Sequence, residues 1–343
     1  MDRLISEIQA YGGRPAASEV VKTIYFGGGT PSLLEPLQIE RILAEIRRVF
    51  PLDIREITIE VNPDDVSAAF LEALYSIGIT RLSMGVQTFQ PDLLADMNRA
   101  HSREEALTCM ELLQKSTFES YSVDLIYGNP GQSLDDLDSD LDLLLGFDPP
   151  HISAYSLTIE PGTRLGKQVE LGRIIPPEDD RVADHFDLIN RRLKGEGIER
   201  YEVSNYSKPG REAVHNSSYW KHQNYLGLGP GAHSFWWDRE AVRWEHKRSL
   251  RAYLKEQDIR SEPEALTLEQ LAEERLMMGL RTREGVAVAE LDQRYDYRLN
   301  ERQSTYLAAR EEEQKLNFDS RIKLSEVGIR IADAIILDLI TLH

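Results

Sequence analysis

Strand-like and helix-like patterns alternate through the first half of the chain, and this alternation restricts its fold more than any other feature. Apolar runs rich in β-forming residues begin near Ile24, Glu56, Leu82, Tyr121 and Ile152. The stretches between these runs repeat apolar residues at the i, i+3, i+4, i+7 spacing of a helix with one buried face. Because strands joined by a helical crossover pair in parallel, the pattern predicts a parallel sheet with helices outside it.

The N-terminus departs from this alternation. Leu4, Ile5 and Ile8 have the spacing of the last turns of a helix, and no strand precedes them. A parallel barrel does not naturally begin inside a helix. We therefore expect an α/β fold of a particular kind, a partial (open) parallel β/α barrel whose first strand is missing.

The pattern loosens after Glu160. It predicts a helix over 178–193, a strand or loop over 201–208 and a short helix over 249–257. From Thr267 onward the sequence is helical, with a short hairpin near 316–324 and a last helix from Ser325, which is typical of a winged-helix-like module. The predicted division is a barrel over 1–200, a connecting segment over 201–260 and a helical C-terminal domain over 261–343.

Charge and cysteine content exclude several classes of function. With 58 acidic and 40 basic residues the chain has a net charge of −18, so no nucleic-acid partner is expected. The one cysteine, Cys109, rules out an internal disulfide framework and a site of several thiolates, and its helical context is that of a small core residue. No run approaches the roughly 20 apolar residues that span a bilayer and no secretory signal opens the chain, so we expect a cytoplasmic protein.

Hydrogen-bonding residues lie at or near the ends of four successive strand-like runs. They are Thr30, Glu60, Gln87 and Asp124. A single polar strand end is common, but the carboxyl ends of parallel strands meet at one mouth, so the repetition indicates a ligand site. The stretch from Gly27 to Pro31 would let a ligand approach the backbone closely, with a plain tight turn as the alternative. Ser32 stands where a dinucleotide fingerprint needs its third glycine.

The combined motifs are specific for one family. In chain order they read IYFGGGTPSLL, ITIEVNPDD, LSMGVQTF, MNRAH, VDLIYGNPGQ, ISAYSLTIEPGT, HNSSYW and YLGLGPGAHSF. The chain resembles the radical SAM proteins related to oxygen-independent coproporphyrinogen III oxidase, and its last two motifs are similar to those of the HemW-type heme chaperone branch. The resemblance covers essentially the whole chain and implies a partial barrel of radical SAM type, open and six-stranded in complete relatives.

The resemblance also implies a site for S-adenosylmethionine. Gly28, Gly29 and Thr30 would pack on the methionyl moiety of the ligand. The rest of the nucleotide site would be lined by Glu60, Gln87, Arg99 and Asp124. The Arg99 guanidinium would meet the ligand's carboxylate, although the residue pattern alone favours a solvated surface arginine.

One feature of the family is absent from the sequence. Relatives hold a 4Fe–4S cluster on a C-x-x-x-C-x-x-C loop after the first strand, and this chain has no such motif. Together with the missing strand, this predicts a sequence that starts late and lacks roughly 45–60 residues of the usual layout. We assign S-adenosylmethionine and the cluster to the full-length form as cofactors, and we assign no catalytic or metal-binding residue in this chain.

The HNSSYW motif offers groups suited to heme. His215 and Tyr219 share one face if the segment is helical, and imidazole and phenolate are both axial donors to heme iron. Trp220 and Tyr225 would supply aromatic faces for the porphyrin. The alternative is a packing motif in which His215 and Tyr219 hydrogen-bond across the domain junction. Further candidates are His222 and His233 as iron ligands, and Arg211 and Lys221 as partners of the propionates.

The resemblance implies a heme chaperone that binds heme and passes it to apo-haemoprotein acceptors, such as respiratory ones. It allows a peripheral membrane association and leaves the oligomeric state open. Two alternatives remain at this stage. One is an oxygen-independent coproporphyrinogen III oxidase, which decarboxylates two propionates by radical chemistry in porphyrin biosynthesis, although no such activity is expected of this chain. The other is a non-catalytic scaffold that has lost its cofactor site.

Overall fold

The computed structural model describes residues 1–256 and 259–343. Contacts divide the chain into two compact units. The sheet unit comprises 22–40 and 54–212, and the terminal unit comprises 1–21, 41–53 and 213–343. The three-part division predicted from the sequence stays a prediction.

A seven-stranded sheet forms the sheet unit, with strand order β1-β2-β3-β4-β5-β7-β6. Its strands are β1 (Val21–Phe26), β2 (Leu52–Val61), β3 (Arg81–Gln87), β4 (Tyr121–Tyr127), β5 (His151–Ser156), β6 (Glu199–Glu202) and β7 (Asn205–Ser207). Strands β2 to β5 pair in parallel, and β7 runs antiparallel to both β5 and β6. All five strand-like runs are strands, and the predicted parallel α/β fold is confirmed.

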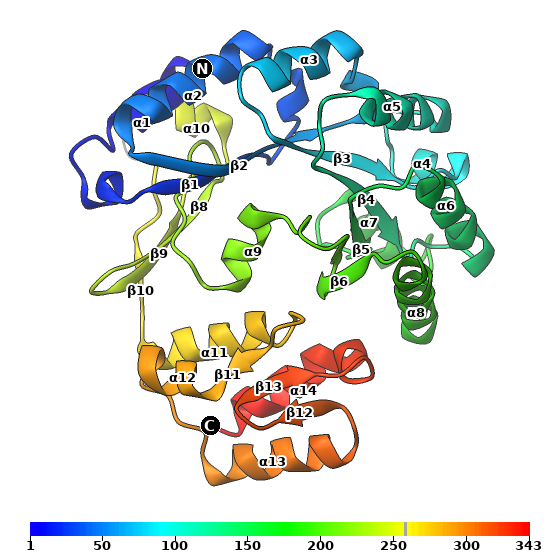
Figure 1. Cartoon of the computed structure of the whole chain (residues 1–343), viewed down its shortest axis with the longest axis vertical. Coiled ribbons are helices and arrows are strands. Elements are labelled where there is room, and N and C mark those ends of the chain that lie inside the picture. Colours follow the sequence, from blue (N-terminus) through cyan, green and yellow to red (C-terminus); the bar gives the residue numbers. More distant parts are fainter. Residues whose placement is uncertain (257–258) are drawn as a thin grey trace. The chain divides into compact units, whose positions relative to one another are not determined.

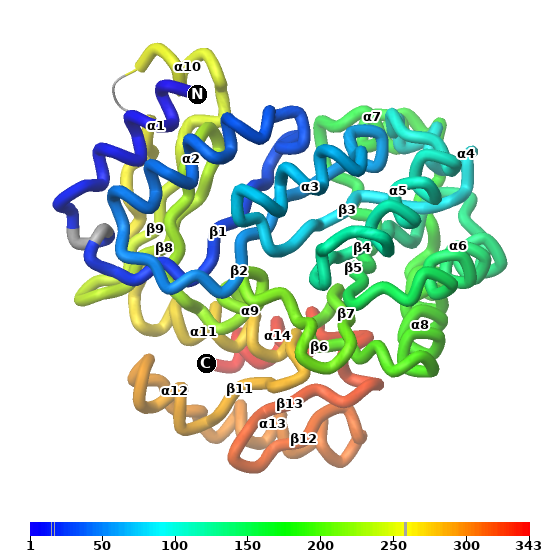
Figure 2. The backbone as a smooth tube through the Cα atoms, turned by 45° about the horizontal axis from the view of Figure 1, so that its top comes forward, coloured from blue at the N-terminus to red at the C-terminus, as the bar shows by residue number. Residues whose placement is uncertain are grey.

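Helices cover the outer side of this curled sheet. The helices that lie wholly in the sheet unit are α3 (Ala68–Ser76), α4 (Pro91–Asp96), α5 (Arg103–Lys115), α6 (Leu134–Gly146), α7 (Arg164–Glu170) and α8 (Asp179–Gly195), with 3-10 turns at Pro31–Leu33 and Pro63–Asp65, while α2 (Pro36–Val49) has residues in both units. Figure 1 shows α3, α5, α6 and α8 along the convex side, and Figure 2 follows the same alternation by colour. On β3 the fully buried Leu82, Met84 and Val86 alternate with Ser83 and Gly85, as the strand period of two requires.

Local signals set the helix boundaries in this unit. Pro91 occupies the first turn of α4, as predicted. The start of α3 differs from the prediction, since Asp64 and Asp65 lie in a 3-10 turn and the Ser67 side chain instead caps the helix by accepting from Phe70 N. A predicted helix over 178–193 is α8. The segment near 201–208 forms the β6–β7 hairpin.

The terminal unit contains two small antiparallel sheets, ordered β10-β9-β8 and β11-β13-β12. Its strands are β8 (His233–Trp237), β9 (Ala241–Glu245), β10 (Glu264–Leu266), β11 (Val286–Ala287), β12 (Leu316–Phe318) and β13 (Arg321–Leu324). Its helices are α1 (Asp2–Gln9), α9 (Val214–Trp220), α10 (Leu250–Lys255), α11 (Leu268–Gly279), α12 (Val288–Tyr295), α13 (Glu301–Glu312) and α14 (Ala332–Thr341), with 3-10 turns at Pro15–Ser18 and Gly328–Ile331.

The structure contains the elements predicted for this part, but the last helix begins later than predicted. The hairpin near 316–324 is β12–β13, and α11 begins after a capping box at Thr267. The last helix begins at Ala332 rather than at Ser325, because Ser325 closes the hairpin by donating its N–H to Lys315 O, and a 3-10 turn follows. The helix predicted over 249–257 is α10, and Gln257 lies outside the described residues. Among residues 1–256 and 259–343, no helix is long and apolar enough to cross a bilayer.

Candidate functional site

A cavity of about 240 Å³ lies at the carboxyl ends of the parallel strands. Its lining residues are Gly29, Thr30, Pro31, Ser32, Glu60, Val61, Asn62, Ser83, Gly85, Gln87, Arg99, Asp124 and Tyr155. The structure therefore brings together every residue predicted for the nucleotide site, with Gly28 beside the cavity through its hydrogen bond to Glu60. Glu60 and Asp124 lie on the same face of the sheet, as one common mouth requires.

Glu60 is held by the glycine turn and by a tyrosine. Tyr25 Oη donates to Glu60 Oε1 at 2.9 Å, and Gly28 N donates to Oε2 at 3.2 Å. Burial raises the pKa of Glu60, and these two hydrogen bonds offset part of that rise. Gly28 and Gly29 have φ of +77° and +133°, a backbone that favours glycine. The turn thus presents backbone N–H groups and a carboxylate, which suits a ligand that carries both donors and acceptors.

Asp124 lies in a cradle of hydroxyl groups. Ser83 Oγ donates to Asp124 Oδ2 at 2.9 Å and Ser122 Oγ donates to Oδ1 at 2.8 Å. Behind them, Ser122 Oγ contacts His151 Nδ1 at 3.0 Å and Ser153 Oγ at 2.8 Å. Burial raises the pKa of Asp124, and the serine hydroxyls oppose that rise. A carboxylate in this position is ready to pair with a ligand's ammonium or to accept from its hydroxyls.

Gln87 reaches the cavity from an unusual backbone conformation. Its φ is +69°, and the pairing of β3 with β4 shifts register between Met84 and Gln87. The side chain lies over Gly85, where an added Cβ would come within 2.5 Å of Gln87 Nε2. Asp140 fixes the following turn by accepting from Phe89 N at 3.0 Å and Thr88 Oγ1 at 2.5 Å. Gln87 is thus aimed into the cavity by its surroundings.

Arg99 lies at the exposed rim of the same cavity. It follows α4, and its N–H donates to Leu94 O at 2.9 Å. This position is compatible with both interpretations of the residue, and the contact with a ligand carboxylate stays a prediction.

Several lining residues were missed by the sequence analysis. They are Asn62, Ser83, Gly85 and Tyr155, together with Tyr25 behind Glu60. Most carry a signal in the strand period of two: Ser83 and Gly85 precede Gln87 on one face, and Asn62 follows Glu60 by two positions. Tyr25 carries no such signal, since its hydrogen bond to Glu60 joins residues 35 apart in sequence.

The HNSSYW motif lies in the helix α9, so His215 and Tyr219 share one helix face. His215 Nε2 lies 2.9 Å from Tyr219 Oη, and the Tyr225 ring packs edge-on against Tyr219 with centroids 4.8 Å apart. Partial desolvation of its ring raises the pKa of Tyr219 to about 12, so its phenol is neutral at pH 7. A phenol hydroxyl can donate or accept, so the direction of this hydrogen bond is set by the tautomer of the His215 ring.

The two histidines after α9 differ from each other. His222 is buried, and its ring stacks on Phe235 at 4.7 Å and on Tyr295 at 5.9 Å. It is a packing residue, so its candidacy as an iron ligand was wrong. His233 is exposed and its Nε2 lies 3.2 Å from Glu245.

The structure also places Arg211 and Lys221, the predicted partners of the heme propionates. Arg211, in the sheet unit, pairs with Glu119 at 3.7 Å, and Lys221 is exposed in the terminal unit. The glycine stretch that follows is closely packed at its start, since a Cβ on Gly227 would lie 2.1 Å from His233 O.

The residues of this chain do not fit a 4Fe–4S cluster. Such a cluster is held by Cys thiolates, and the chain has one cysteine. Cys109 is buried in α5 against Met84, and burial raises the pKa of its thiol to about 12. The prediction that Cys109 is a core residue is confirmed. No group of three or more His, Cys, Asp or Glu side chains in the described residues could hold a metal ion.

Comparisons with known proteins agree with this geometry. The Radical SAM superfamily pattern matches residues 7–144, and the HemN C-terminal domain pattern matches 266–331. A protein of Bacillus subtilis named heme chaperone HemW is 36% identical over 279 residues, which cover 80% of this chain and 73% of that protein. The chain belongs to the HemW family. A second HemW protein, from Lactococcus lactis, is 34% identical over 86% of this chain and 76% of its own length.

The HemW family assignment has a structural counterpart. The structure of the radical SAM enzyme coproporphyrinogen III oxidase (HemN) from Escherichia coli superimposes with a TM-score of 0.81 at 21% identity, covering 99% of this chain and 82% of that one. At this identity the likeness shows the fold alone. It confirms the predicted barrel type with a helical C-terminal domain.

Proposed function

We propose that this protein is a heme chaperone, which binds heme and passes it to apo-haemoproteins. The observation that carries the proposal is the pair of relatives named heme chaperone HemW, each at least 34% identical over at least 80% of this chain. Helix α9 supports it, because it presents a histidine, a tyrosine and a tryptophan on one short segment. The cytoplasmic location and the nature of the acceptors stay predictions from the sequence.

His215 is the best candidate for the iron ligand. Its Nε2 lies 2.9 Å from the Tyr219 hydroxyl oxygen, and a neutral imidazole nitrogen is the commonest side-chain ligand of metals in proteins. Tyr219 is a weaker candidate, because a phenol whose pKa is raised to about 12 must lose its proton before it binds iron. Trp220 follows directly and is half-buried, which leaves part of its indole face available to a macrocycle.

The sheet-unit cavity is proposed to bind S-adenosylmethionine. Carboxylates at Glu60 and Asp124, the amide of Gln87 and the Arg99 guanidinium match the ligand's ammonium, hydroxyl and carboxylate groups. Gly28, Gly29 and Thr30 supply the close backbone approach. When bound in a radical SAM protein, this cofactor supplies a 5′-deoxyadenosyl group. In this chain the residues would bind and orient it.

Heme titration followed by absorption spectroscopy tests the main proposal. His215→Ala is expected to shift the Soret band and to weaken heme binding at least tenfold, as loss of an axial ligand should. His343→Ala is the matched control, because it removes an exposed histidine that pairs with Glu269 in the same unit and is not a predicted heme ligand. A protein that binds no heme, or a His215→Ala variant with the parental spectrum and affinity, would contradict the proposal.

A further inference from the structure

Helix α9 is too short to be stable by itself. It has seven residues, Val214–Trp220, and none of them is buried. Isolated helices of this length are marginal in water, and most helices gain their stability by packing an apolar face. Contacts from outside the helix must therefore fix the position of its side chains.

Two arginines hold the carboxyl end of α9. Arg275 Nη1 donates to Trp220 O at 3.3 Å, and Arg294 Nη2 donates to His222 O at 2.9 Å, with Nη1 3.5 Å from Lys221 O. These carbonyls belong to the last residue of α9 and to the two residues after it. At this end a helix leaves its acceptors unpaired and carries partial negative charge. Cationic donors at this end both satisfy the carbonyls and favour the helical direction.

The arginines are themselves fixed within the C-terminal domain. Arg275, on α11, is 6% exposed and makes a two-point contact with Glu290 of α12 at 2.8 and 3.0 Å. Arg294, also on α12, lies over the rings of Trp237 and Tyr295 at 4.8 and 5.3 Å. Their guanidinium groups thus have little freedom to leave the α9 carbonyls.

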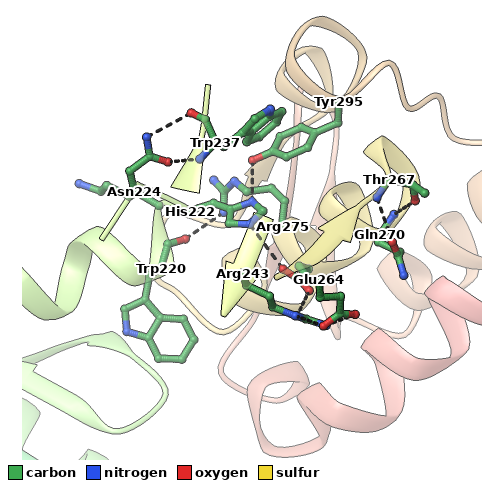
Figure 3. A network of polar contacts seen from close by, with 12 residues as sticks. Trp220, His222, Asn224, Trp237, Arg243, Glu264, Thr267, Gln270, Arg275 and Tyr295 are labelled. Atoms are coloured by element: carbon green, nitrogen blue, oxygen red, sulfur yellow. Dashed lines mark hydrogen bonds and ion pairs between the residues drawn. The ribbon is translucent and has the colours of Figure 1, made fainter. Parts of the chain in front are cut away.

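His222 completes this attachment one residue beyond the helix C-cap. Its backbone turns at φ +54°, and its ring is stacked between Phe235 and Tyr295. Nδ1 lies 3.2 Å from Tyr295 Oη and Nε2 lies 3.5 Å from Glu274. Figure 3 shows His222 beside Tyr295 and Arg275, with the Trp220 indole directed away from them.

We propose that the C-terminal helical domain is the support that positions α9 for heme, with Arg275, Arg294 and His222 as positioning residues. The inference rests on the proposed function, in which α9 carries the heme ligand. It assigns a role to the C-terminal helical domain, which contributes no predicted heme or S-adenosylmethionine ligand. Consistent with this role, α9 lies against α11 of that domain.

The test is a double variant of the full chain, Arg275→Met with Arg294→Met. Each methionine keeps an apolar stem and removes the cation from the helix end. Amide hydrogen exchange over 214–222 is expected to accelerate about tenfold, while exchange in β12 and β13 stays unchanged. The heme spectrum is expected to shift in the same variant, because His215 no longer has one fixed orientation. A second double variant, Arg275→Met with Arg294→Lys, keeps the charge at position 294. It should restore most of the exchange protection over 214–222.

Arg298→Met is the matched control. It removes an arginine that follows α12 and pairs with Asp292 at 2.8 Å, in an exposed position with no contact to α9. If the double variant fails to fold, Arg294→Met alone replaces it. Unchanged exchange over 214–222 would overturn the inference. Faster exchange with an unaltered heme spectrum would overturn it as well, since α9 would then be held without consequence for heme. If the parent binds no heme, the proposed function fails while the exchange result still decides whether the domain holds α9.

Discussion

The Nε2 atom of His215 and the hydroxyl oxygen of Tyr219 lie 2.9 Å apart and are hydrogen-bonded to each other. These are the two atoms of α9 best suited to bind heme iron, so iron must displace this hydrogen bond. The protein without heme thus keeps its proposed ligand in an internal hydrogen bond. Heme binding then carries a cost equal to the net worth of that hydrogen bond.

Tyr219→Phe and His215→Ala should therefore act in opposite directions. Phenylalanine keeps the ring that packs against Tyr225 and removes the competing hydroxyl, so heme binding should strengthen by roughly 2- to 10-fold, the worth of one neutral hydrogen bond. The measurement is heme titration with Soret detection. A loss of binding on Tyr219→Phe equal to that of His215→Ala would instead make the phenol oxygen part of the heme site.

Asp124→Asn should stabilise the protein at neutral pH. Burial raises the folded-state pKa of Asp124 above its unfolded value, so ionisation disfavours the folded state and stability falls as pH rises through that range. Asparagine carries no charge and can still exchange hydrogen bonds with Ser83 and Ser122. We expect a gain of about 1 kcal/mol in the free energy of unfolding at pH 7, typical of relieved functional strain.

The pH dependence gives this prediction its control. At acid pH both side chains are neutral, so the difference between Asp124→Asn and the parent should shrink as the pH falls. Urea unfolding at several pH values measures it. Asp135→Asn, at an exposed position in the first turn of α6, should show no such gain. A parent more stable than Asp124→Asn at pH 7 would mean that the ionised carboxylate is favoured in the fold. Binding of S-adenosylmethionine should weaken in the same variant.

The sheet and its cavity could largely be predicted from the sequence, because both follow from local periodicity. Strand and helix periods locate the elements, and parallel pairing then brings Glu60, Gln87 and Asp124 to one edge. The same reasoning extended to the period of two would have added Ser83 and Asn62. Contacts between distant segments could not be read in this way. Tyr25 meets Glu60 only because β1 and β2 are neighbours in the sheet.

His222 shows why a residue type alone misleads. Its place beside HNSSYW made it a candidate ligand, yet its partners come from β8 and from α12, 73 residues away in sequence for Tyr295. Nothing in the local pattern indicates that a ring will be sandwiched between two others. The contact of His215 with Tyr219 could be predicted, because the two residues lie four positions apart on the same helix.

Anaerobic reconstitution of this chain with iron and sulfide should yield no stoichiometric 4Fe–4S cluster. Its one thiol is buried in α5, and its raised pKa of about 12 keeps it protonated and a poor ligand. Iron content and cluster absorbance measure the outcome. Cys109→Ala serves as the control and should give the same background. Stoichiometric iron lost on Cys109→Ala would show that the thiol takes part in a site.

Gly28→Ala should weaken the binding of S-adenosylmethionine through the backbone of its turn. Gly28 has φ +77° with no atom near its Cβ position, so alanine meets no clash and costs only the strain of a left-handed backbone, about 1–2 kcal/mol. If the turn relaxes to relieve that strain, Gly28 N leaves Glu60 and the ligand loses its close approach.

Gly13→Ala is a matched control, because Gly13 has the same φ of +77°, equally open surroundings and a position in the other unit. The two variants should lose similar stability in urea unfolding, while only Gly28→Ala should weaken S-adenosylmethionine binding in calorimetric titration. Equal binding by both variants would separate the glycine turn from the proposed ligand.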